Sequence, residues 1–218
     1  RALCTACGRC AAACHAGALE LSGKSVTAGE VLDIALRDRL FYETSGGGLT
    51  LSGGEPSQQP DFARALLELA RGAGLHTAME TCGSASPACL KRLAPLTNLF
   101  LFDFKETDPA RHRAFTGADN GPILNALRGL HAEGCAIVLR CPIIPGLNDR
   151  EDHFDGIARL WRELPGLAGV EIMAYHRLGD SKLERLGLTR DGRLPAGTPA
   201  PETVAAWKAA LRRRGVPA

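Results

Sequence analysis

The sequence predicts an α/β fold in which parallel strands alternate with helices and form an open or partial barrel. Two observations carry this prediction. Short apolar runs of strand length are separated by longer segments with helical periodicity, and strands that alternate with helices pair in parallel through right-handed crossovers. The chain has no dinucleotide-binding fingerprint, and the glycine run at 45–48 lacks the lysine of a phosphate loop. A doubly wound nucleotide-binding fold is therefore not favoured.

The expected elements follow one another along the chain. A polar stretch and a helical pattern at 29–43 come first. The runs that we expect to form strands are 49–52, 75–80, 99–105, 136–145 and 169–176. The segments that we expect to form helices are 61–74, 86–94, 121–134, 150–164 and 201–215. We expect two units, a small segment over 1–24 and the barrel over 25–218.

Composition argues against several classes of protein. The 218 residues are 45% hydrophobic and 23% charged, as in an ordinary globular domain, and the net charge of +2 does not favour nucleic acid or an anionic membrane. No apolar run approaches the roughly 20 residues that span a bilayer, and no signal-peptide pattern is present. We expect a cytoplasmic protein with neither nucleic acid nor a membrane as a partner. Its eight cysteines should then be reduced.

The opening segment concentrates half of those cysteines. Cys4, Cys7, Cys10 and Cys14 are separated by two, two and three residues, the spacing with which thiolates surround a 4Fe–4S cluster. A tetrahedral zinc site is the alternative, but zinc loops usually pair two cysteines with two ligands much further along. His15 stands where two-cluster ferredoxins have a proline, so either Cys14 completes a single cluster or a second quartet lay upstream. The four other cysteines are scattered, and we expect them to be buried.

The predicted strands carry ionisable residues at their carboxyl ends. These residues are Glu55, Glu80, Lys105, Arg140 and His176. Ligands of parallel α/β folds bind at this edge of the sheet. A single charge at a strand exit is ordinary, whereas five in succession favour a binding site.

The third strand sharpens this expectation. Side chains alternate along a strand, so Asp103 and Lys105 share one face, while the phenylalanines between them share the other. The phenylalanines can pack under the helices, which directs Asp103 and Lys105 into the barrel. A charged pair there is costly unless it binds something, and the alternative is an internal salt bridge.

The loop after the first strand is the third candidate feature. Gly53 and Gly54 permit close approach of the backbone to a ligand, and the Glu55 carboxylate suits an ammonium group. Without its neighbours, this tripeptide would be interpreted as a plain turn.

In their order along the chain, these stretches resemble the activating enzymes of glycyl radical enzymes, within the radical S-adenosylmethionine superfamily. The resemblance is carried by CTACGRCAAACHAGAL, FYETSGGGLTLSGGEPSQQPDF, HTAMETCG, LFDFKETDPARHRAFTGADN, LRCPIIPGLND and YHRLGDSKLERLG. It covers nearly the whole chain. It implies a partial (β/α)6-type barrel that lacks its first strand, preceded by a ferredoxin-like iron–sulfur segment.

The resemblance also implies an activity. Such enzymes reduce a 4Fe–4S cluster that binds S-adenosylmethionine, cleave the cofactor to methionine and a 5′-deoxyadenosyl radical, and remove a hydrogen atom from a glycine of a partner glycyl radical enzyme. A flavodoxin or a ferredoxin-type protein would supply the electron. The opening quartet is similar to the auxiliary-cluster insert of the longer family members.

The family's pattern assigns roles to the strand-end residues. Ser52 to Glu55 would line the methionine end of the cofactor, with the Gly53–Gly54 backbone near its ammonium group. Glu80 and Thr81 would lie near the cofactor, and with Asp103 and the Leu101 carbonyl they can bind a monovalent cation. The remaining implied cofactor-binding residues are Asp103, Phe104 and Lys105 after the third strand, and Arg140 and His176 on the carboxylate or ribose side.

One departure from the family concerns the catalytic motif. Three cysteines spaced by three and two residues should precede the insert, and this sequence contains no such loop. Truncation is the expected reason, natural loss of catalysis the alternative, and we expect this chain to be inactive alone. Two other functions stay open: a radical S-adenosylmethionine enzyme acting on a small molecule, and a non-catalytic iron–sulfur electron-transfer module.

Overall fold

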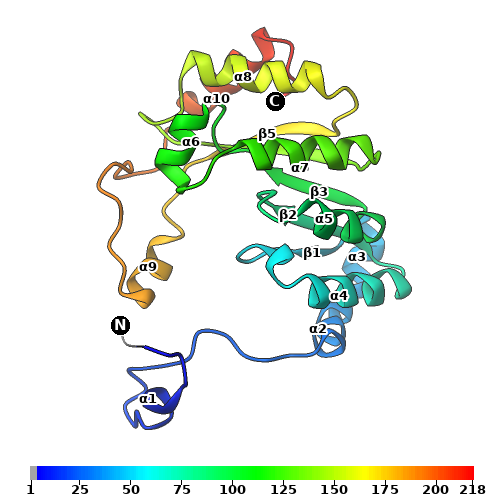
Figure 1. The fold of residues 1–218 in the computed structure, drawn as a ribbon, viewed down its shortest axis with the longest axis vertical. Coiled ribbons are helices and arrows are strands. Elements are labelled where there is room, and N and C mark those ends of the chain that lie inside the picture. Colours follow the sequence, from blue (N-terminus) through cyan, green and yellow to red (C-terminus); the bar gives the residue numbers. More distant parts are fainter. Residues whose placement is uncertain (1–3) are drawn as a thin grey trace.

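A computed structural model describes residues 4–218 and has a five-stranded parallel sheet at its centre (Figure 1). The strands are β1 (Gly48–Leu51), β2 (His76–Thr81), β3 (Leu99–Asp103), β4 (Ile137–Ile143) and β5 (Gly169–Ala174). Their order in the sheet, β1-β2-β3-β4-β5, is their order in the chain. The predicted parallel α/β fold is confirmed, with every strand inside or within one residue of its predicted range.

Helices precede, connect and follow the strands. They are α1 (Arg9–Ala12), α2 (Ala28–Ala35), α3 (Arg39–Ser45), α4 (Pro60–Gly72), α5 (Pro87–Leu93), α6 (Pro109–Thr116), α7 (Gly121–Ala132), α8 (Glu151–Glu163), α9 (Asp180–Leu186) and α10 (Pro201–Arg213), with short 3-10 turns at Leu36–Asp38, Pro56–Gln58 and Ala94–Leu96. A capping box begins α2, because Thr27 and Glu30 exchange hydrogen bonds at 2.7 and 3.2 Å. Among residues 4–218, no helix is long and apolar enough to cross a membrane.

The core lies between the sheet and one layer of helices. In α4 and α7 the buried residues recur at the spacing of one helical face: Ala63, Leu66, Leu67 and Ala70, and Ile123, Ala126, Leu127 and Leu130. On β3 and just beyond it, Phe100, Phe102 and Phe104 are fully buried in this core, whereas Asp103 and Lys105 stay partly exposed. The alternation predicted for this strand is therefore confirmed, and it leaves the charged pair on the opposite side of the sheet.

Besides the four-residue α1, two helices were not predicted. One of them, α6, buries only His112 among its described residues and so lacks the apolar stripe that reveals α4 and α7. Its start does carry a local signal, since the Asp108 side chain accepts a hydrogen bond from the Arg111 amide at 2.8 Å and Pro109 is the first helical residue. The other, α9, lies beyond the carboxyl ends of the strands (Figure 1).

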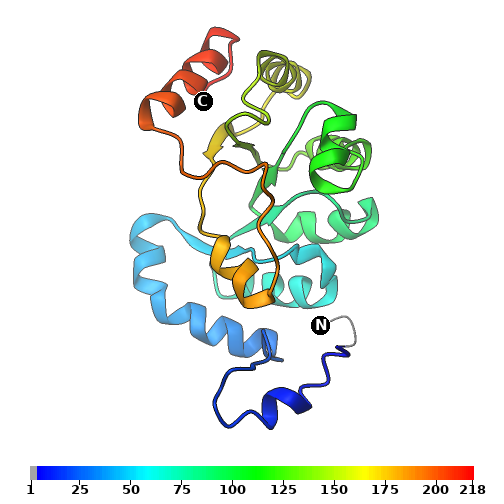
Figure 2. The same cartoon turned by 90° about the vertical axis from the view of Figure 1, so that its left-hand side faces the viewer.

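The N-terminal segment stands apart from the sheet. In two perpendicular views, α1 and the chain around it lie below the helices and are joined to α2 by an extended stretch (Figures 1 and 2). A side-chain contact between Glu20 and Arg185 links this segment to α9. The segment presents three of its four thiols to solvent.

The turn after β2 makes a first testable prediction. Gly83 has a φ of +70°, and a Cβ added there would lie 2.5 Å from Cζ of the buried Phe102. Gly83→Ala should lower the free energy of unfolding by about 1–3 kcal/mol, because an overpacked core must shift. Urea unfolding measures this loss. Gly117→Ala is the matched control, since Gly117 has a φ of +79° but open space around the added atom; equal losses would contradict the steric explanation.

Candidate functional site

The carboxyl ends of the parallel strands bring five predicted residues into one polar network, which we call the strand-end network. It consists of Ser52, Glu80, Asp103, Lys105 and Arg140. Arg140 Nη1 lies 2.6 Å from Glu80 Oε1, and its Nε lies 3.9 Å from Asp103 Oδ1. Lys105 Nζ lies 3.5 Å from Asp103 Oδ2, and the Ser52 hydroxyl donates to Glu80. Residues from four consecutive strands or their exits therefore meet, as predicted.

The strand-end network contains both positively and negatively charged side chains. The Ser52 hydroxyl is the largest cause that lowers the pKa of Glu80; burial opposes it, and Arg140 adds to it. The Arg140 side chain is 16% exposed, whereas those of Glu80 and Asp103 keep about a third of their surface, at 34% and 31%. The buried Nε of Arg140 has no hydrogen-bond partner within residues 4–218. The network can therefore offer carboxylate acceptors and cationic donors to one ligand.

Glu55 lies beside this network but is used differently. Its Oε1 accepts hydrogen bonds from the Ser57 hydroxyl (2.5 Å) and the Thr81 hydroxyl (2.9 Å), and its Oε2 accepts one from the Cys82 amide (2.9 Å). Burial alone would raise the pKa of Glu55, but these donors, led by Ser57, outweigh it and lower the pKa. The carboxylate thus ties the loop after β1 to the end of β2. The adjacent Gly53–Gly54 backbone borders open space, since an added Cβ at either position would meet nothing within 4 Å.

Three other predicted residues lie outside the network. Thr81 is buried and accepts a hydrogen bond from the Gly83 amide (3.0 Å). Phe104 is 1% exposed, so its side chain packs in the core and leaves only its backbone near the site. His176 is exposed two residues beyond β5, where its Nδ1 accepts from the Leu178 amide (3.4 Å). Their roles toward a cofactor stay predictions.

The four thiols of the cysteine quartet are free, but they do not converge on one point. Cys4, Cys7 and Cys10 are exposed, Cys14 is half-buried, and all four are free. Hydrogen bonds from Arg9 lower the pKa of Cys7 to about 7, so a thiolate is available there near neutral pH. Within residues 4–218, no three His, Cys, Asp or Glu side chains lie close enough to hold a metal ion. The chemistry of four thiol donors suits an iron–sulfur cluster, and the quartet's role still depends on its spacing.

The scattered cysteines are less buried than predicted. Cys141 on β4 is fully buried, and burial raises its pKa. The other three are half-buried: Cys82, Cys89 and Cys135. Cys82 lies at the exit of β2, Cys89 on the short helix α5 and Cys135 in the loop before β4. At these positions the chain does not cover the side chain completely.

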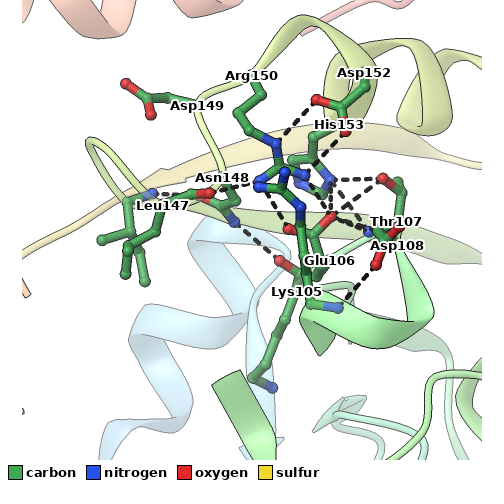
Figure 3. Close-up of polar contacts among 12 residues, drawn as sticks. Lys105, Glu106, Thr107, Asp108, Leu147, Asn148, Asp149, Arg150, Asp152 and His153 are labelled. Atoms are coloured by element: carbon green, nitrogen blue, oxygen red, sulfur yellow. Dashed lines mark hydrogen bonds and ion pairs between the residues drawn. The ribbon is translucent and has the colours of Figure 1, made fainter. Parts of the chain in front are cut away.

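A second polar network, absent from the predictions, surrounds the residue after Lys105, and the Lys105 side chain points away from it (Figure 3). Glu106 is fully buried, and its carboxylate meets the Arg150 guanidinium through two contacts of 3.1 and 3.2 Å. His153, also fully buried, places Nδ1 3.2 Å from the same carboxylate. Burial would raise the pKa of Glu106, but His153 and Arg150 hold it well below its usual range. In the sequence, Glu106 is visible only as an acidic residue beside Lys105, and nothing marks its distant partners Arg150 and His153.

A cavity of about 200 Å³ adjoins the strand-end network through Lys105. Lys105 and Asn148 contribute to its wall, and α6 and the loop before α10 close it. Its other lining residues are Phe115, Thr116, Pro142, Ile144, Leu147, Asp191, Arg193 and Leu194. The wall is mainly apolar, with charged groups from Lys105 and the 191–193 loop.

Comparisons of the sequence with known proteins find related chains. The sequence model described as "Radical SAM superfamily" matches residues 5–157. The chain is 46% identical to the isethionate sulfite-lyase activating enzyme of Nitratidesulfovibrio vulgaris, over 84% of this chain and 60% of that protein. It is 38% identical to the (2S)-3-sulfopropanediol sulfolyase activating enzyme of Bilophila wadsworthia, over 83% of this chain and 70% of that protein.

A solved structure supports the fold. A domain of a pyruvate-formate lyase-activating enzyme from Bacteroides vulgatus matches with a TM-score of 0.64 and 24% identity, covering 78% of this chain and 96% of that domain. The chain spans about three fifths of the length of the first curated relatives that it matches, 60% and 59%.

Proposed function

The chain belongs to the radical S-adenosylmethionine superfamily, and we propose that the protein is an activating enzyme that places a radical on a glycine of a partner glycyl radical enzyme. Relatives that are 38–46% identical to the chain are named activating enzymes of lyases, which favours this role over a small-molecule reaction or simple electron transfer. A flavodoxin or ferredoxin-type donor and a cytoplasmic location belong to the same proposal. So do a ferredoxin-like segment at 1–24 and a barrel at 25–218.

The observation that carries the proposal is the mixed charge of the strand-end network. The methionine end of S-adenosylmethionine is a zwitterion, so a site for it needs cationic and anionic groups within a few ångströms of each other. Arg140 and Lys105 would bind its carboxylate, while Glu80, Asp103 and the Gly53–Gly54 backbone would face its ammonium group and ribose. When bound to a reduced 4Fe–4S cluster, the cofactor supplies the radical chemistry. The chain's own residues hold and orient it.

The partner-directed role can be tested by complex formation. Where a neighbouring gene encodes a glycyl radical enzyme, that enzyme should co-elute with the chain in anaerobic size-exclusion chromatography when S-adenosylmethionine is present. An unrelated enzyme of similar size, such as a soluble aldolase, is the control and should elute separately. Separate elution of the glycyl radical enzyme and the chain would contradict the activating role, even if the chain binds S-adenosylmethionine.

Cofactor binding makes a second prediction. Lys105→Ala should weaken S-adenosylmethionine binding by about tenfold to a hundredfold, because one charge-assisted hydrogen bond contributes about 1.5–3 kcal/mol. His176→Ala should weaken it less, since this side chain is exposed and outside the strand-end network. Equilibrium dialysis with radiolabelled cofactor measures both. Glu163→Gln, which removes an exposed partner of Arg128, is the control; equal affinities in all four proteins would contradict the assignment.

The quartet makes a third prediction. Anaerobic reconstitution with iron and sulfide should load at most one cluster onto this chain, since it holds one quartet and no three-cysteine catalytic loop. Cys4→Ala and Cys7→Ala should each abolish that loading, because thiolate ligation leaves no spare donor. Cys135→Ala, outside the quartet, should load normally. Iron and sulfide analysis that finds two clusters on the unmodified chain would contradict this account.

A further inference from the structure

The connection from β3 to α6, residues 104–108, carries Lys105 out of the sheet. The Phe104 amide still donates to the Arg140 carbonyl on β4 (2.8 Å), but from Lys105 onward the backbone leaves the strand. A long flexible side chain reaches a defined point only when the backbone beneath it is fixed. The contacts of this connection therefore decide where the Lys105 ammonium group lies.

Buried amide side chains hold three successive carbonyls of this connection. Asn148 is 3% exposed, and its Nδ2 donates to the Lys105 carbonyl (2.9 Å) and to the Pro142 carbonyl of β4 (2.8 Å). Asn120, 1% exposed, donates to the carbonyls of Glu106 (3.2 Å) and Thr107 (3.1 Å). The Asn148 side chain is itself oriented, because its Oδ1 accepts from the Ile144 amide (2.7 Å). The backbone on both sides of the Lys105–Glu106 peptide bond is thus fixed from α7 and from the loop after β4.

The Glu106 side chain anchors the same connection to α8 and its entry. Besides Arg150 and His153, its carboxylate accepts hydrogen bonds from the amides of Thr107 (2.8 Å) and Asp108 (3.1 Å). Gly156 on α8 allows this close packing, since an added Cβ would lie 2.4 Å from the Thr107 side chain. A buried ion pair is weak evidence for stability, and in some proteins such pairs serve to fix one geometry. A fully buried carboxylate next to a ligand-facing lysine therefore points to a geometric role.

From these contacts we infer that Glu106 and Asn148 are positioning residues for Lys105, an inference that rests on the proposed function. The anchored Glu106 side chain is fully buried, whereas the Lys105 side chain before it stays partly exposed, so the two leave the backbone in different directions. Figure 3 shows the Lys105 side chain running away from Arg150 and His153. Its Nζ then lies 3.5 Å from Asp103 in the strand-end network. Without the two anchors, the ammonium group would sample other positions.

A double-mutant cycle on cofactor affinity tests this inference. Glu106→Gln and Asn148→Ala should each weaken S-adenosylmethionine binding roughly twofold to thirtyfold, the range for residues that act through another. In the Lys105→Ala background both losses should largely disappear, because the group being positioned is gone. Equal losses in the two backgrounds would overturn the inference. Glu163→Gln should change affinity in neither background.

A second measurement needs no cofactor. Reductive ¹³C-methylation gives each lysine an NMR signal, and Lys105→Arg identifies the one from Lys105. Asn148→Ala, which changes no charge, should shift or broaden that signal and leave the Lys208 signal in place. An unmoved Lys105 signal in a variant with lowered thermal stability would show a merely structural role and overturn the inference. If the unmodified chain binds no S-adenosylmethionine, the strand-end assignment of the proposed function fails, and this measurement alone decides the positioning role.

Discussion

Replacing Glu106 with alanine is expected to lower the free energy of unfolding by about 3–5 kcal/mol, the range for breaking a buried ion pair by removing one partner. The substitution removes one carboxylate partner of the Arg150 guanidinium, which is 20% exposed and keeps Asp152 and the Leu147 carbonyl, and it removes the carboxylate beside the fully buried His153. The Asp108 amide also loses its acceptor, while the Thr107 amide keeps only His153 Nδ1. Urea unfolding at neutral pH measures the loss.

The control for this experiment is Glu163→Ala. Glu163 and Arg128 lie 2.6 Å apart, but both side chains are at least 40% exposed, so the loss should stay within about 1 kcal/mol. Similar losses in the two variants would contradict the importance of burial. The Glu106 ion pair would then contribute no more to the free energy of unfolding than an exposed pair does.

The pH dependence of the same comparison follows from the depressed pKa of Glu106. A carboxyl group whose pKa is lower in the folded than in the unfolded state stabilises the fold above its unfolded value, near 4.5, and loses that contribution as the pH falls toward the folded value. The difference between the unmodified chain and Glu106→Ala should therefore be full at neutral pH and decrease below pH 4.5. A difference that grows on acidification would contradict the sign of the shift.

Arg140→Ala is expected to affect the candidate site as strongly as Lys105→Ala does. It leaves the carboxylates of Glu80 and Asp103 on one side of the sheet without the guanidinium between them, so the pKa of Glu80 should rise. S-adenosylmethionine affinity should fall about tenfold to a hundredfold, the effect of one lost charge-assisted bond. Stability should fall less than in Glu106→Ala, because both carboxylates keep about a third of their surface in water.

Equilibrium dialysis with Arg140→Lys as a companion variant separates charge from shape. A lysine keeps the positive charge but cannot reach Glu80 and Asp103 through a planar fork, so its affinity should lie between those of the unmodified chain and the alanine variant. Unchanged affinity in Arg140→Ala would show that this side chain only bridges the two carboxylates.

Local pattern predicted the sheet and much of the site. The strands were visible because apolar runs recur between helical segments, and the alternation of three phenylalanines with Asp103 and Lys105 placed the charged pair correctly. Strand polarity then required the strand-end residues to converge, which Arg140 and Glu80 do.

Features that depend on distant partners were not predictable. Glu106 meets Arg150 across 44 residues, and no periodicity in either segment marks that pairing. The orientation of Glu55 was hidden for the same reason, because its partners Thr81 and Cys82 come from the next strand's exit. The helix α6 was not predicted, because capping and a proline, rather than an apolar stripe, define it.

The agreement between sheet order and chain order has a consequence for how the protein forms on the ribosome. Each strand pairs with the strand synthesised just before it, so no strand must wait for a distant segment before it finds a neighbour. The sheet can therefore grow one β–α unit at a time during translation. The bonds from Arg150 and His153 to Glu106 form only after α8 emerges, so the nascent chain can pair β1 to β4 before the loop that carries Lys105 becomes rigid, and β5 joins the sheet afterwards.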